Sequence, residues 1–94
     1  MEPWGSKVEV ERRNRILLSL AAYSYEFLAE LIMSDSQFDA LAKAIDPSID
    51  TGNPELDNFF KKEFSPSTGM WIYKHPELLK VINLYRHIMK ILPE

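Results

Sequence analysis

Four side chains that can hold a small ligand lie close together in the first half of this chain. Tyr25 is followed by the segment 34–39, in which Asp35 and Asp39 are four residues apart and share one face of a helix. An aromatic ring beside carboxylates can stack on a flat ring and accept hydrogen bonds from hydroxyl or amide groups. Tyr25, Asp35, Phe38 and Asp39 are therefore candidate ligand-binding residues, and their chemistry suits a nucleoside-like ligand.

The same residues also have a structural explanation. An aspartate in the first turn of a helix is stabilised by the positive end of the helix dipole, which accounts for Asp35 without any ligand. Tyr25 and Phe38 are placed to pack against each other across a helical hairpin. The residues alone leave both explanations open.

Positioning these residues requires two helices joined by a bend. Apolar residues recur with the helical period over 8–32 in two adjacent rows, which predicts a long and largely buried first helix. The pattern breaks at Met33-Ser34, and Ser34 with Gln37 forms a capping box that begins a second helix. This second helix is expected to end near Asp46, because a proline follows it. The two helices are predicted to form a hairpin with its bend at Met33-Ser34.

Two further helices are predicted in the second half. Asn53-Pro54-Glu55 combines an N-cap residue, a first-turn proline and a first-turn acid, so a helix is expected from there to Phe64. His75-Pro76-Glu77 repeats this pattern before an amphipathic helix that reaches Leu92. The run 70–73 is apolar, and its pattern does not decide between helix and strand.

These segments predict an all-α fold, in which a helical hairpin is elaborated by two further helices into a small orthogonal bundle. A chain of 94 residues with 46% apolar residues is long and hydrophobic enough for one packed core. We expect a single helical domain over residues 1–94, with the hairpin at 10–45 and the additional helices at 53–92.

A cluster of three arginines lies near the start of the first predicted helix. Arg12 and Arg15 share a helix face and could together hold a phosphate. The favoured interpretation is a solvated face on which Arg12, Arg13 and Arg15 are balanced by Glu9 and Glu11, because charged runs usually stay in water.

The second half is rich in aromatic residues. Phe59, Phe60, Phe64, Trp71 and Tyr73 are candidates either for a partner-binding patch or for the core. The core is favoured, because a small domain needs large side chains to fill it.

Several classes of function lack their motifs. The chain has no cysteine, and its two histidines are twelve residues apart, so no zinc site is expected. His75 is interpreted as a helix cap and His87 as a surface residue. No phosphate-binding glycine loop or serine-nucleophile motif is present, which predicts a protein that is not an enzyme and has no catalytic residue. A net charge of −3 disfavours nucleic-acid binding, and no apolar run is long enough for a membrane span.

The stretch from Tyr23-Ser24-Tyr25-Glu26 through Ser34-Asp35-Ser36-Gln37-Phe38-Asp39-Ala40-Leu41 resembles, without a gap, the N-terminal helical module of bacterial NAD-dependent DNA ligases. In that family a Tyr-His pair ends the first helix and a Ser-Asp-x-x-Tyr-Asp-x-Leu motif opens the second. The module closes over NAD, its rings sandwich the nicotinamide, and its acidic residues help hold the nicotinamide mononucleotide (NMN) half. The resemblance covers residues 10–45, and it implies that Tyr25, Asp35, Phe38 and Asp39 occupy the ligand-binding positions for NAD or NMN.

The chain departs from this family at two site positions. Glu26 stands where the family has histidine, and its carboxylate would repel the phosphate of the nucleotide. Phe38 stands where the family has tyrosine, so stacking is retained while a hydroxyl hydrogen bond is lost. The Lys-x-Asp-Gly adenylation motif of ligases is absent, which excludes ligation by this chain.

Two hypotheses about function follow. The first is a non-catalytic interaction protein, derived from the ligase module, whose aromatic second half binds another protein. The alternative is a binder of a nicotinamide-type nucleotide, NMN or NAD, that acts alone or as an accessory to a ligase-like partner. A stand-alone module of this kind is expected in a phage or mobile element. The lack of cysteine and of an export-signal pattern favours the cytoplasm.

Overall fold

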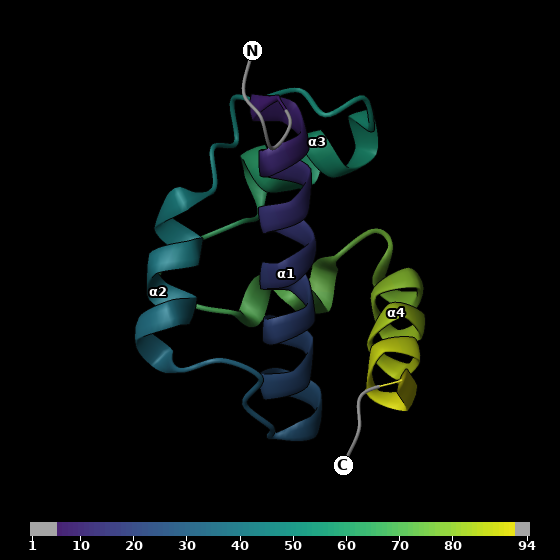
Figure 1. Ribbon diagram of the computed structural model, residues 1–94. Helices are drawn as coiled ribbons and strands as arrows, with labels where there is room; N and C mark the ends of the chain where they lie inside the picture. Colours follow the sequence, from purple (N-terminus) through teal and green to yellow (C-terminus); the bar gives the residue numbers. More distant parts are fainter. Residues whose placement is uncertain (1–5, 92–94) are drawn as a thin grey trace.

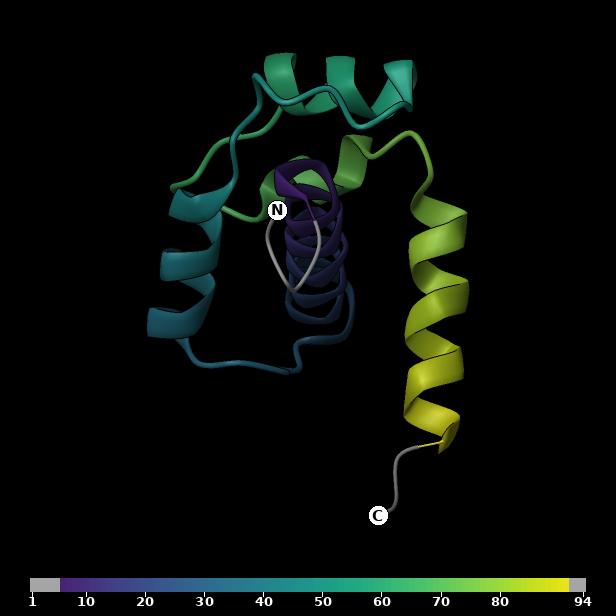
Figure 2. The ribbon, with the colours of Figure 1, turned by 45° about the horizontal axis from the view of Figure 1, so that its top comes forward.

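The computed structural model describes residues 6–91 and folds them around one long central helix. In chain order the elements are α1 (Lys7–Leu28), α2 (Asp35–Ala44), α3 (Pro54–Lys62), the 3-10 helix η1 (Met70–Lys74) and α4 (Leu78–Ile91). Helices α2 and α4 lie on opposite sides of α1, and α3 lies across its N-terminal end (Figures 1 and 2). The predicted all-α class is confirmed. The expected end of the last helix, at Leu92, lies outside the described residues.

The core lies where side chains of α2, α3, η1 and α4 pack against α1, and it is rich in aromatic rings. Phe60 is 1% exposed, and its ring is 5.7 Å from the ring of Trp71 between centroids. Phe59 is buried beside both. The prediction that the aromatic second half fills the core is confirmed for these three residues, whereas Tyr73 lies exposed on the surface.

Helix α1 ends earlier than the apolar pattern predicts. It stops at Leu28, and Ala29 takes a left-handed conformation with φ of 55°. The amide of Glu30 then donates to the carbonyl of Ser24 at 3.0 Å, and the buried Ser24 hydroxyl lies 3.0 Å from the Glu30 carbonyl oxygen. The prediction of a helix through Ile32 is therefore wrong: the bend spans the whole connection 29–34, because local hydrogen bonds stop the helix while the apolar residues continue.

The buried stretch of α1 is also shorter than predicted. The stretch Leu18–Ser24 is buried, but Ile16 and Leu17 are about half exposed. Helix α2 begins as expected, since Ser34 and Gln37 form the predicted capping box. The N-cap at Asn53 is likewise present at the start of α3.

A buried guanidinium ties three segments of the chain together. Arg15 is 5% exposed. Its Nε donates to Glu11 Oε2 at 2.6 Å, and its Nη1 donates to Asp57 Oδ1 at 2.8 Å. Its Nη2 donates to the carbonyl oxygens of Asp46 and Ile49 at 3.1 and 3.0 Å. Helix α1, α3 and the connection between α2 and α3 therefore meet on one side chain.

Neutral donors complete this cluster. Glu11 Oε1 accepts from the Asp46 amide at 3.0 Å, and Asp57 accepts from the Thr51 hydroxyl at 2.6 Å and the Thr51 amide at 3.0 Å. Burial raises the pKa of Asp57, but hydrogen bonds from Thr51 and Arg15 outweigh it and hold this pKa below its ordinary value. Asp57 is therefore ionised at neutral pH, as its pairing with Arg15 requires.

The prediction of a solvated basic face is wrong for this part of α1. Arg15 and Glu11 are both buried. Arg12 Nε donates to the carbonyl of Thr51 at 2.8 Å. Helical periodicity shows which residues share a face, but it does not show that a connection distant in the sequence folds over that face.

We expect the substitution Arg15→Met to destabilise the protein by about 3–5 kcal/mol, because it leaves two buried carboxylates without their cation. Urea unfolding followed by circular dichroism measures this loss. Arg86→Met, at an exposed position of α4, is the matched control and should cost less than 1 kcal/mol. Equal stability of the two variants would contradict a structural role for the Arg15 cluster.

We expect Ala29→Gly to raise stability by about 1 kcal/mol, because glycine adopts the left-handed conformation without the penalty that a Cβ incurs. For a domain of this size the melting temperature should rise by about 4–8 °C. Ala40→Gly, at an exposed position inside α2, should instead lower it, because glycine disfavours a helix interior. A lower melting temperature for Ala29→Gly would show that α1 does not end in this turn.

Candidate functional site

Three of the four sequence-predicted site residues line one cavity. Tyr25 on α1 and Asp35 and Phe38 on α2 border an open cavity of about 160 Å³. The remaining lining residues come from α1, from the connection after it and from the loop before η1: Ala21, Ala22, Leu31, Ile32, Met33 and Gly69. We call it the Tyr25–Phe38 cavity.

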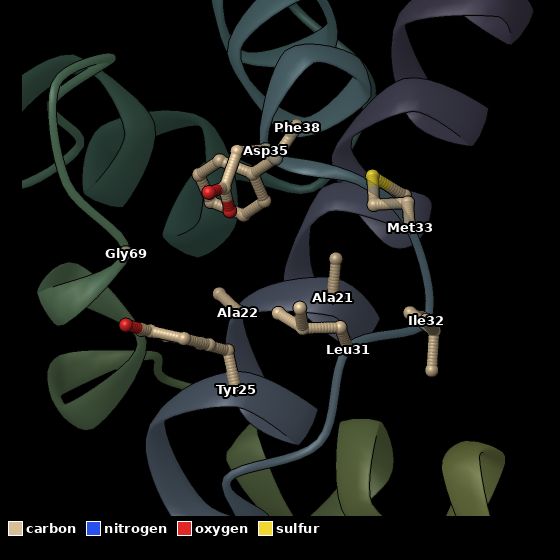
Figure 3. Close-up of a pocket in the computed structure, with 9 residues that line it drawn as sticks. All are labelled: Ala21, Ala22, Tyr25, Leu31, Ile32, Met33, Asp35, Phe38 and Gly69. Atoms are coloured by element: carbon tan, nitrogen blue, oxygen red, sulfur yellow. The ribbon is translucent and has the colours of Figure 1, made fainter.

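The cavity has two aromatic walls and one carboxylate. In Figure 3 the Phe38 and Tyr25 rings lie on opposite sides of the opening, with Ala22 between them, and Asp35 lines the cavity from the same helix as Phe38. Tyr25 is 56% exposed, so its ring faces solvent as well as the cavity. A cavity of roughly 150 Å³ holds a benzene-sized ring. The site can therefore take one flat ring and accept a hydrogen bond from it at Asp35.

Asp39, the fourth predicted residue, does not line this cavity. Its carboxylate pairs with Lys43 on the same helix at 3.0 Å, and both side chains are more than half exposed. It borders an adjoining, shallower depression that Asp35 and Phe38 also line, together with Ser36, Pro66 and Ser67. A spacing of four places Asp35 and Asp39 on one face of α2, but only the first turn of that helix reaches the cavity.

The loop before η1 lies against the cavity at Gly69, at distances that would also leave room for a Cβ atom. A Cβ built on Gly69 would lie 3.5 Å from Ala22 Cβ, 3.5 Å from Phe38 Cζ and 3.7 Å from Glu26 Oε2. The half-buried Glu26 therefore has its carboxylate beside this loop, and its carbonyl accepts from the Tyr73 hydroxyl at 3.0 Å. None of the nine lining residues is a lysine or arginine. The cavity thus offers negative charge and apolar surface, and no cation for a phosphate.

The residues that close the cavity were not predicted from the sequence. Leu31, Ile32 and Met33 contribute one side of it, yet the apolar pattern assigned the first two to a helix face. Gly69 carried no signal of its own beyond loop formation. The sequence feature that could have indicated the break is Ser24, whose short side chain competes for backbone hydrogen bonds near a helix end.

The two histidines occupy different environments. His75 is buried against the Phe59 ring, and its Nδ1 accepts from the Glu77 amide at 3.0 Å just before α4, which fits its interpretation as a cap. Burial lowers the pKa of His75 to about 4, and the nearby Glu77 only partly opposes this shift. His87 is exposed. Within residues 6–91 no group of three or more His, Asp or Glu side chains is arranged to hold a metal ion.

Comparison of the chain with protein-family models, with curated proteins and with solved structures gives no match. None of the helices in the described part of the chain is both long and apolar enough to cross a bilayer.

We expect the stability of the protein to fall as the pH is lowered from about 6.5 to about 4. Within this window the unfolded chain protonates His75 while the folded chain keeps it neutral, so protons favour unfolding. The loss attributable to His75 should reach at most about 3 kcal/mol. Urea unfolding at several pH values measures it. His75→Asn keeps a hydrogen-bond acceptor and should flatten the curve in this window; an unchanged slope would contradict the lowered pKa.

Proposed function

We propose that this chain is a non-catalytic interaction protein, related to the N-terminal module of NAD-dependent DNA ligases, that acts in the cytoplasm. Its docking site is the Tyr25–Phe38 cavity, which receives one aromatic side chain of a protein partner. The observation that carries this proposal is the cavity itself: two aromatic walls, one carboxylate and a volume of about 160 Å³. The six-membered ring of an indole fits this volume, and its N–H group supplies a donor for the carboxylate.

The surroundings of the cavity support a protein as the occupant. Leu31 is 63% exposed and Ile32 43%, and both border the opening. Exposed apolar side chains that gather around a concave site are typical of interaction surfaces.

The surface proposed here differs from the one that the sequence suggested. The aromatic second half was expected to grip the partner, but Phe59, Phe60 and Trp71 are buried in the core and are unavailable for binding. The exposed apolar residues beside the cavity belong instead to the end of α1 and the connection to α2, while other exposed apolar residues lie on η1 and α4.

A nicotinamide-type nucleotide is the second candidate ligand. Three of the residues that the ligase resemblance assigns to NMN binding line one cavity, whose volume suits a single ring, and this favours the nucleotide. Two features oppose it: the cavity has no cation for the phosphate, and Asp39 points its charge toward Lys43 instead. We therefore rank the nucleotide below a protein side chain.

Titration of two small ligands into isotopically labelled protein distinguishes these candidates. We expect N-acetyltryptophanamide, which mimics a partner side chain, to shift the resonances of Tyr25, Phe38 and Leu31. NMN should bind in the millimolar range at best, because a lost hydroxyl hydrogen bond costs about 0.5–1.5 kcal/mol and the Glu26 charge adds a similar loss. If the cavity descends from a ligase site, Glu26→His combined with Phe38→Tyr should bind NMN at least tenfold more tightly.

The titrations have three distinguishable outcomes. Shifts at the cavity with N-acetyltryptophanamide alone support the interaction protein. Tighter NMN binding by the parent protein than by the double variant would contradict the assignment of Glu26 and Phe38. No shift with either ligand in either protein would contradict the cavity as a binding site.

A further inference from the structure

A second cavity lies on another side of α1, between α1, α3 and α4. Its volume is about 320 Å³, twice that of the Tyr25–Phe38 cavity, and the two have no lining residue in common. Its apolar walls come from all three helices: Ile16, Leu20, Leu56, Val81 and Leu84. Small-molecule sites are typically concave, mostly apolar and about 300–1,000 Å³ in volume. The second cavity meets this description and the first does not.

Its volume and walls indicate the size of a ligand. Because a cavity of roughly 150 Å³ holds a six-carbon ring, this one takes a ligand of about ten non-hydrogen atoms. Apolar atoms form most of its exposed surface, so most of the ligand must be apolar as well.

The charged side chains at the cavity differ in how they are compensated. Arg15 lies between Glu11 and Asp57, and neither of these carboxylates lines the cavity. Lys80 and Glu77 both line it and pair with each other at 3.0 Å. These groups are thus engaged with one another within the protein.

Arg12 is the exception. It lines the cavity and is exposed, and the partner of its guanidinium is the neutral carbonyl of Thr51. Within residues 6–91 no carboxylate forms an ion pair with Arg12. His75 adds a second donor: because its Nδ1 accepts from the Glu77 amide, the neutral ring carries its proton on Nε2.

We propose that the second cavity binds a small amphipathic carboxylate, with an apolar body of about eight carbon atoms against Ile16, Leu20 and Val81 and its carboxylate at Arg12. An arginine pairs with a carboxylate through two parallel hydrogen bonds, which gives the site a preference for this head group over an alcohol or an amine. The site is independent of the function proposed for the Tyr25–Phe38 cavity.

Three probes with the same number of carbon atoms test the proposal: octanoate, whose eighth carbon belongs to the carboxylate, 1-octanol and octylamine. Each is titrated into protein labelled at its methyl groups. We expect octanoate to shift the methyl resonances of Ile16, Leu20 and Val81, and to bind at least tenfold more tightly than the other two probes. The resonances of Leu31 and Ile32, at the first cavity, should stay unchanged.

Variants separate charge recognition from simple apolar binding. Arg12→Gln should weaken octanoate binding about tenfold and leave 1-octanol binding unchanged. Arg12→Lys retains the positive charge and should keep the preference for octanoate, which shows that replacing Arg12 does not by itself unfold the protein. Arg86→Gln, away from the cavity, is the matched control and should bind like the parent. Equal affinity for octanoate and 1-octanol, shifts centred on Leu31, unchanged octanoate binding by Arg12→Gln, or no shift with any probe would each overturn the proposal.

Discussion

The arrangement of the helices depends on the buried guanidinium of Arg15. An unpaired charge in the interior costs several kcal/mol, so Arg15 is tolerated only where carboxylates and carbonyls surround it. Those partners come from α1 itself, from α3 and from the connection between α2 and α3. The requirement to satisfy one side chain therefore brings together segments more than thirty residues apart in the sequence.

The same cluster explains how so short a chain keeps a defined core. The Arg15 guanidinium lies 4.9 Å over the Phe60 ring, so the ionic cluster and the aromatic core share a boundary. At the other end of α1, the Tyr85 hydroxyl donates to Glu30 at 3.1 Å and links α4 to the connection that follows α1. Burial of Tyr85 raises the pKa of this hydroxyl, so it remains a donor at neutral pH. Polar contacts thus hold neighbouring segments against α1 near both of its ends, and apolar side chains pack against the part of α1 between them.

Much of this fold is predictable from the sequence because the signals are local. The capping box at Ser34 and the N-cap at Asn53 each act within three residues, and both are present as expected. The Arg15 cluster and the end of α1 were not predicted, because they depend on distant segments and on a left-handed alanine that no propensity favours. The candidate site shows the same division: Tyr25, Asp35 and Phe38, which the sequence spacing groups together, line one cavity, but the spacing did not indicate that Asp39 would pair with Lys43.

The two cavities arise because different sides of α1 carry side chains of different size and face different elements. Where Ala21 and Ala22 face α2 and the loop before η1, small side chains leave room for a single ring. Where Ile16 and Leu20 face α3 and α4, a larger space with a mainly apolar surface remains, and Arg12 is among its lining residues. Both cavities are walled by one continuous helix, whose packing leaves few alternative arrangements. Binding at one cavity changes affinity at the other only if α1 itself shifts, so the energetic coupling between them depends on how firmly the Arg15 cluster holds that helix.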